Sequence, residues 1–210
     1  MKKLLITSLL ATFAAVQASA ISIVDFTPNS AGPGVADVTF TGFADGAQSA
    51  FAILPGVTLA YNSAVIVQGG ANNSEGAMPF PTTGSDYLSV KKGGQADFVF
   101  ASALERTFGF QWGSIDAYNT ISFLLNGVLQ TSFTGSQVVS SPVAANGNQG
   151  LNGSAYVTFA GVFDAVRLTS SGNSFEIDNL SVQAVPDAGT TVALLGASLL
   201  GLAFFRRFAK

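Results

Sequence analysis

The sequence of 210 residues contains no cysteine and no histidine. Without cysteine no disulfide bond can form, so packing and backbone hydrogen bonds must hold the fold together. Without histidine, Ser-His-Asp and Cys-His catalytic triads and histidine-ligated zinc or haem are excluded. The catalytic groups that remain possible are a carboxylate pair or a Ser-Lys dyad, and no pattern in the sequence brings such groups together. We therefore expect a protein that is not an enzyme.

Charged residues make up only 10% of the chain and are unevenly distributed. Residues 21–184 carry eleven acidic side chains against four basic ones, a net charge of −7. The whole chain stands at −3, because its other basic residues lie near the two ends. An acidic segment without a basic cluster is a poor partner for nucleic acid or anionic lipid. The acidic residues that a catalytic pair would draw on are Asp86, Asp97, Glu105, Asp116, Asp164 and Glu176.

The first 20 residues have the three parts of a signal peptide. Met1-Lys2-Lys3 is basic, Leu4 to Val16 is apolar, and Ala18-Ser19-Ala20 has the small-x-small pattern that signal peptidase accepts. A permanent membrane anchor is the alternative, but the apolar run is short for one. We therefore expect export, removal of residues 1–20 by signal peptidase, and a mature chain that begins at Ile21.

The last 26 residues also fall into three parts. A turn with a proline, 185–189, precedes an uncharged apolar run from Val192 to Phe205, and Arg206-Arg207 and Lys210 follow. This order predicts a short transmembrane helix with a cytoplasmic basic stop. The alternative is a buried C-terminal helix of a soluble domain. The run is apolar on all sides and lacks the polar stripe of such a helix.

This C-terminal segment resembles the PEP-CTERM sorting signals of exosortase-dependent bacterial surface proteins. The matching residues are Val185, Pro186, Asp187, Gly189, Thr190, Thr191, Leu194, Leu195, Gly196, Leu202, Arg206 and Arg207. Asp187-Ala188 stands where the name-giving motif has Glu-Pro, so the segment looks like a VPD variant. The resemblance implies a transient inner-membrane anchor that an exosortase-type membrane protease removes. It also implies a destination at the cell surface or in an extracellular polysaccharide matrix.

Residues 21–184 are expected to form one all-β domain, a jelly-roll-like β-sandwich. Short β-branched and aromatic runs alternate with Gly, Asn, Ser and Pro. Asn126-Gly127 predicts a type I′ hairpin, whereas Gly69 to Pro81 and Ala144 to Ser154 are expected to be loops. The expected strands are 21–26, 36–40, 58–61, 64–68, 86–90, 96–100, 107–111, 117–125, 128–133, 155–159, 165–170 and 175–183, with 48–54 as a further strand or a short helix.

Two stretches allow a functional interpretation. The first holds the only tryptophan, Trp112, followed by Asp116 and Tyr118. Exposed, these residues would contact a sugar; the alternative is that Trp112 fills the core. Residues 112–123 also resemble a segment in one family of exosortase-dependent surface proteins.

The second stretch is FEIDNLSV, residues 175–182. It resembles the closing strand of jelly-roll domains, which include many carbohydrate-binding modules. Asp178 would then help to hold a structural calcium ion, because a hard cation prefers carboxylate and carbonyl oxygens. The alternative is an aspartate at a bulge or turn, and the sequence has no spaced calcium-binding loop.

These observations favour a non-catalytic exported surface or matrix protein, sorted by an exosortase. The alternative is a module that binds exopolysaccharide through Trp112 or Tyr118.

Overall fold

The computed structural model describes residues 20–34, 36–43, 50–62, 64–69, 74–81, 85–144, 153–185 and 195–198. Strands dominate these ranges, so the all-β prediction is confirmed. Helical structure among them is limited to α1 (Gly135–Val139), η1 (Pro142–Ala144) and one turn at 195–198. The strands are β1 (Ser22–Pro28), β2 (Phe51–Leu54), β3 (Val57–Tyr61), β4 (Val65–Gln68), β5 (Tyr87–Val90), β6 (Gln95–Gly113), β7 (Asn119–Leu125), β8 (Val128–Thr134), β9 (Ala155–Ser170) and β10 (Phe175–Ala184).

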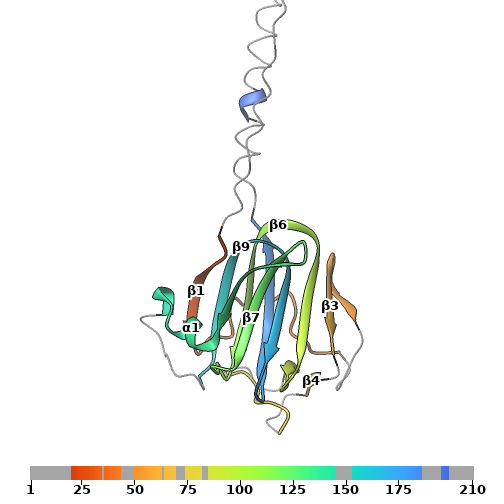
Figure 1. Ribbon diagram of the computed structural model, residues 1–210, viewed down its shortest axis with the longest axis vertical. Helices are drawn as coiled ribbons and strands as arrows, with labels where there is room; N and C mark the ends of the chain where they lie inside the picture. Colours follow the sequence, from red (N-terminus) through yellow and green to blue (C-terminus); the bar gives the residue numbers. More distant parts are fainter. Residues whose placement is uncertain are drawn as a thin grey trace, which may run out of the picture.

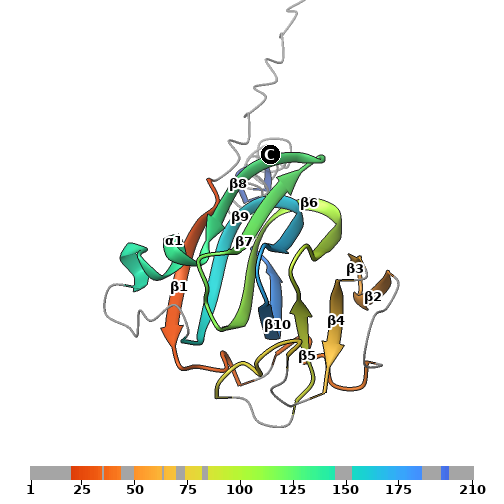
Figure 2. The same cartoon turned by 60° about the horizontal axis from the view of Figure 1, so that its bottom comes forward.

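The strands form one open antiparallel sheet organised around the two longest strands, β6 and β9 (Figures 1 and 2). The first part of β6 pairs with β3 and its last part with β10. In the same way, β9 pairs first with β1 and then with β7. Because β6 and β9 also pair with each other along both parts, they carry the sheet from one layer into the other.

The continuity of β6 and β9 corrects the sequence-based expectation, which split each of them into two strands. Residues 96–100 and 107–111 belong to β6, and 155–159 and 165–170 belong to β9. The β6–β9 register shifts between Val99 and Leu104, where the strand bends and residues 101–104 are exposed. A bulge of this kind bends a strand without ending it.

Arg106 lies at this bend and holds it from the inside. Its guanidinium group lies 4.2 Å from the centroid of the Phe100 ring and donates a hydrogen bond to the carbonyl oxygen of Ser102. A cation over an aromatic face is stabilising, more so when the pair is shielded from water. Burial lowers the pKa of Arg106 from its ordinary value, and the charge of Asp164 partly opposes that shift.

Phenylalanine rings from the two layers meet in the core. Alternate residues of a strand face the same side, so β6 directs five aromatic residues inward: Phe98, Phe100, Phe108, Phe110 and Trp112. Phe98 and Phe108, from the two parts of β6, have ring centroids 5.3 Å apart, which shows that the strand folds over on itself. Burying each such side chain contributes about 2 kcal/mol.

Several local predictions are confirmed, and one is wrong. Leu125 pairs with Val128 around Asn126 (φ 52°) and Gly127 (φ 75°), the positive angles that the type I′ hairpin requires. Residues 51–54 form a strand. In contrast, 36–40 contributes only an isolated bridge between Val38 and Leu180. The strands form one open sheet, which does not establish the jelly-roll connection order, and that order stays a prediction.

The two ends of the domain leave from the same end of the sheet. Ser22 of β1 pairs with Ala160 of β9, and Ala184 of β10 pairs with Arg106 of β6. Arg106 in turn pairs with Gly161, so these residues lie side by side across four strands. At a strand spacing of about 4.8 Å, the two ends lie roughly 14 Å apart. Figure 1 shows the start of β1 and the end of β10 at this end of the sheet.

Candidate functional site

The expected sorting motif begins where β10 ends. The backbone N–H of Val185 donates a hydrogen bond of 2.9 Å to the carbonyl oxygen of Glu105, one residue beyond the last pair of the strand. The other residues of the motif and of the basic stop lie outside the described residues: Pro186, Asp187, Gly189, Thr190, Arg206 and Arg207. None of the helices within the described ranges is long and apolar enough to cross a membrane.

At the N-terminal cleavage pattern, Ala18 also lies outside the described ranges. Ala20 is described and exposed, two residues before β1 begins. A peptide bond at that point is accessible without unfolding of the sheet.

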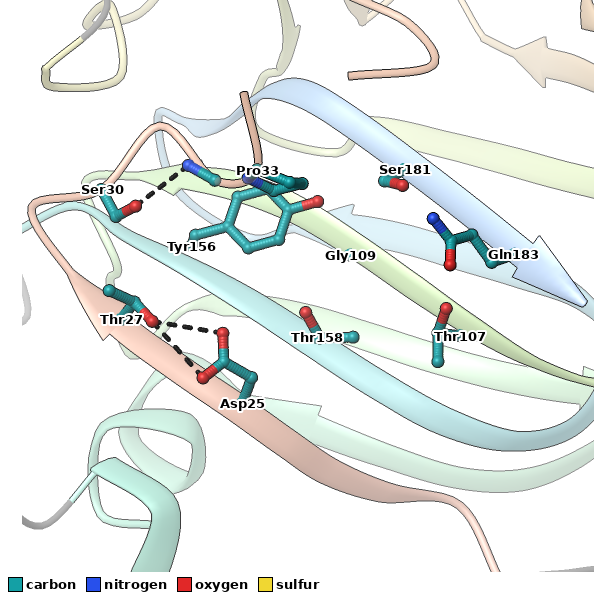
Figure 3. Close-up of a pocket in the computed structure, with 11 residues that line it drawn as sticks. Asp25, Thr27, Ser30, Pro33, Thr107, Gly109, Tyr156, Thr158, Ser181 and Gln183 are labelled. Carbon is teal, nitrogen blue, oxygen red and sulfur yellow. Dashed lines mark hydrogen bonds between the residues drawn. The ribbon is translucent and has the colours of Figure 1, made fainter. Parts of the chain in front are cut away.

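A polar groove crosses the outer face of β1, β9, β6 and β10 (Figure 3). Its volume is about 420 Å³. We call it the outer-face groove, and its lining residues are Asp25, Thr27, Ser30, Gly32, Pro33, Thr107, Gly109, Tyr156, Thr158, Ser181 and Gln183. Apart from Ser181, which lies in the stretch FEIDNLSV, none of them falls in a stretch for which the sequence analysis offered a functional interpretation.

The groove follows from the alternation of side chains along the strands. Phe108 and Phe110 of β6 point into the core, so Thr107 and Gly109 lie on the outer face. Gly109 pairs with Thr158 on one side and with Ser181 on the other. A row of small and hydroxyl-bearing residues therefore runs across the strands, and Asp25 of β1 extends it beside Thr158.

Gly109 is what allows Tyr156 to lie across β6. A Cβ atom at Gly109 would come within 2.8 Å of the Tyr156 hydroxyl oxygen and 3.0 Å of Thr158 Oγ1. Gly32 packs against the Tyr156 ring in the same way, with an added Cβ only 2.2 Å from ring carbons. The phenol end therefore forms part of the groove floor (Figure 3). Burial raises the pKa of Tyr156 to about 12, so its hydroxyl group stays protonated.

A second cavity, the end pocket, contains two of the three sugar-contact candidates. Its volume is about 270 Å³, and its lining residues are Ser74, Gly76, Ala77, Ser114, Asp116, Tyr118, Asn173, Ser174 and Glu176. The Tyr118 hydroxyl lies 2.7 Å from a carboxylate oxygen of Asp116 and 2.7 Å from the carbonyl oxygen of Asn173. Burial, with the hydrogen bond to Asp116, raises the pKa of Tyr118. These groups thus satisfy one another.

Glu176 brings a second carboxyl group to the end pocket. Only 2% of the residue is exposed; its Oε1 accepts a hydrogen bond from the hydroxyl of Ser174 and one of 2.9 Å from the N–H of Ala77. Burial raises the pKa of Glu176, and these hydrogen bonds oppose the shift. Through Oε1, this carboxyl group holds the loop 74–77 against β10.

Trp112 is not a surface aromatic residue. It is fully buried, and its ring stacks on Phe175 with centroids 4.3 Å apart. The core alternative of the sequence analysis therefore describes Trp112, which is excluded as a ligand contact. The structure brings Asp116 and Tyr118 together but separates them from Trp112.

Asp178 lies at a β-bulge. The β10–β6 register shifts between Asp178 and Ser181, and Asn179 has a φ of 48°. The Asp178 carboxylate accepts hydrogen bonds of 2.7 Å from the Ser85 hydroxyl and from the Asn179 N–H. Burial raises the pKa of Asp178 to about 6. In the described part of the chain no three His, Cys, Asp or Glu side chains gather as metal ligands, and a calcium role for Asp178 stays a prediction.

Comparisons with known proteins centre on the C-terminus. Residues 184–207 match the model of the VPDSG-CTERM motif, a PEP-CTERM-like C-terminal sorting motif. No curated protein matches the chain. Among solved structures, the enzymatically active domain of tailspike protein 4 from bacteriophage CBA120 aligns at a TM-score of 0.30 and 16% identity. That alignment covers 62% of this chain and only 19% of the tailspike chain, a similarity too low to indicate a shared fold.

Proposed function

We propose that this chain is a non-catalytic, exported surface or extracellular-matrix protein, which an exosortase-type membrane protease processes at its C-terminal signal. The observation that carries the proposal is the sorting motif at residues 184–207. It begins at Ala184, the last residue of β10, so the signal follows the folded domain directly.

The backbone explains why the domain and the signal meet at this point. The hydrogen bond from Val185 to Glu105 continues the ladder of β10 by one residue. Pro186 has no N–H to donate and cannot extend a ladder further. The described ladder thus reaches Val185, the first residue of the Val-Pro-Asp segment, and in this proposal the apolar run that follows serves as a separate membrane signal.

The two exits of the domain fit an anchored intermediate. Both lie at one end of the sheet, so a leader before Ile21 and an anchor after Val185 would face the same membrane. In this proposal the apolar run presents the Pro-containing turn to the protease, and Arg206-Arg207 fix its orientation by the positive-inside rule. After processing, the domain reaches the cell surface or the extracellular matrix.

The proposal is tested by replacing residues 185–187 with alanine in the native host. The variant is expected to keep its C-terminus and to accumulate in the membrane fraction, while the original chain is shortened and found at the surface. A matched control replaces residues 128–130, at the exposed start of β8, with alanine and is expected to be processed normally. Processing of the 185–187 variant at the original rate would contradict the proposal.

A second candidate function, binding of carbohydrate, loses Trp112 as its aromatic contact. The outer-face groove favours it on different grounds, because it gathers hydroxyl and amide groups from β6, β9 and β10 on one accessible surface.

A further inference from the structure

We propose that the outer-face groove binds an uncharged polysaccharide chain, which it recognises through hydrogen bonds to sugar hydroxyl groups. The proposal relies on the proposed export only for the compartment in which the glycan is met. Its residues differ from every residue that the sequence analysis assigned to sugar contact.

Several side chains of the groove have hydrogen-bonding capacity left open. Within the described ranges, the side chains of Thr107, Thr158 and Gln183 make no hydrogen bond to protein, and all three are at least partly exposed. A threonine hydroxyl and a glutamine amide each donate and accept. Sugar hydroxyl groups have the same dual character, so these side chains match them in either direction.

The charge of the groove favours an uncharged ligand. Among the described residues that line the groove there is no lysine or arginine, and the one charged side chain is the carboxylate of Asp25. Phosphate and uronate groups would meet no positive partner there and would be repelled by Asp25 and by the acidic domain around it. A sugar hydroxyl, in contrast, donates well to a carboxylate. The lining therefore selects an uncharged glycan over an anionic one.

The floor of the groove owes its shape to a glycine in β6. A glycine inside a strand is destabilising and often marks a close approach to that strand. At Gly109 the bare backbone lets the Tyr156 phenol lie flat, so that its hydroxyl comes beside Thr158 at the centre of the groove. Figure 3 shows this arrangement, with Thr107 and Gln183 beyond it. The volume of about 420 Å³ is within the range of small-ligand sites, roughly 300–1,000 Å³.

The end pocket has less open hydrogen-bonding capacity at accessible groups. The Tyr118 hydroxyl, one oxygen of Asp116 and Oε1 of Glu176 are hydrogen-bonded to other protein groups, and Oε2 of Glu176 is buried, so a sugar would have to displace existing hydrogen bonds. The alternative is that the outer-face groove is a solvated sheet face that binds no ligand. In that case, replacing its hydroxyl-bearing side chains would not change binding of any glycan.

The experiment uses the full chain, purified in detergent, and the extracellular polysaccharide of the native host, separated into neutral and anionic fractions by anion exchange. Affinity electrophoresis in gels that contain each fraction measures binding. We expect the chain to be retarded by the neutral fraction and to migrate freely in the anionic one. Replacing two hydrogen-bonding side chains, T158V with Q183A, is expected to weaken retardation about tenfold.

The matched control is T169V, which makes the same Thr-to-Val change on β9 outside the groove. It is expected to bind like the original chain, and the circular dichroism of all variants should be unchanged. G109S, whose side chain would fill the floor, is expected to weaken retardation as well, and unchanged retardation in G109S would contradict the proposal.

Three outcomes would overturn the proposal: no retardation in the neutral fraction, stronger retardation in the anionic fraction, or binding that T158V with Q183A leaves intact. Retardation in the gel does not depend on cleavage of the C-terminal signal. A chain that is cleaved normally but does not bind the neutral fraction would therefore reject the glycan proposal and leave the proposed function intact.

Discussion

The two faces of β6 show how one strand serves two purposes. Its inner face carries Phe108, Phe110 and Trp112, all fully buried, and these rings join the two layers. Its outer face carries Thr107 and Gly109, which line a groove open to solvent. The backbone pairing is the same for both sets, since β9 and β10 flank this part of the strand. Apolar burial is therefore concentrated on one face, and the other face lines a groove that is open to solvent.

The outer face itself divides into an open and a covered part. Gly109 pairs with Ser181 in the open part. Two residues further along, Gln111 pairs with Asp178, where both side chains are fully buried and Ser85 closes over the carboxylate. The two pairs thus differ because Gly109 and Ser181 lie at the floor of the groove, whereas Gln111 and Asp178 are fully enclosed.

The largest expected effect compares the two faces directly. Replacing Trp112 by alanine should lower the free energy of unfolding by about 3–5 kcal/mol, because it leaves a cavity beside Phe175. Replacing Thr107 by alanine should change it by less than about 0.5 kcal/mol. Urea denaturation of both variants measures the difference. Equal effects would show that the inner face does not dominate stability.

The covered part of the outer face should make stability depend on pH. The pKa of Asp178 is raised by burial from 3.8 to about 6, so the folded protein holds this proton more tightly than the unfolded chain. Its contribution to the free energy of unfolding is complete below about pH 4 and is lost as the pH rises through 6. The loss is about 3 kcal/mol, and the raised pKa of Glu176 acts in the same direction.

Denaturation at pH 4, 5.5 and 7 checks this dependence. In D178N, which resembles the protonated acid, the decline between pH 4 and 7 should be smaller by that amount. The control E105Q, on β6, should keep the full decline. A D178N curve parallel to that of the original chain would disprove the assignment.

At the bend of β6 the inner face carries a cation, Arg106, in place of an apolar side chain. In R106K the planar guanidinium that stacks on Phe100 is lost, with an expected cost of about 1–2 kcal/mol. The same substitution at Arg167, which is more exposed, should cost less. Thermal unfolding compares the two, and the reverse order would mean that the stack on Phe100 does not stabilise the bend.

The smallest expected effect concerns the cross-strand pair of Asp97 and Arg167. Arg167 donates to both carboxylate oxygens of Asp97, at 2.8 and 3.0 Å, from directly opposite positions in the sheet. Because both side chains are partly exposed, their coupling should be about 0.2–1 kcal/mol. A double-mutant cycle with D97N and R167Q measures it, and high salt should reduce it. Coupling that is unaffected by salt would point to packing instead of charge.

Features with a short-range signal could be predicted from the sequence. Asn126-Gly127 determines its own turn, and the alternation of phenylalanines along β6 marks the inner face. The C-terminal order of turn, apolar run and arginines is likewise contained in one stretch, and the match at residues 184–207 falls there.

Features that depend on distant residues could not be predicted. In the sequence, the exposed bend of β6 near Leu104 has the pattern of a loop because its alternation breaks, and pairing with β9 on both sides of the bend keeps it in the sheet. The outer-face groove joins Asp25 to Ser181 across four strands, and its threonines look like ordinary outward-facing residues in the sequence. Trp112 drew attention as the only tryptophan, but burial and not residue type decides its role.

The central claim, that the folded domain is exported and then separated from its C-terminal signal, is tested most directly by the intact mass of the protein recovered from the surface or medium of its native host. The account predicts a species that begins at Ile21 and ends within residues 185–189, with any added mass marking an attachment. A mature chain that still carries Arg206, Arg207 and Lys210 would contradict it.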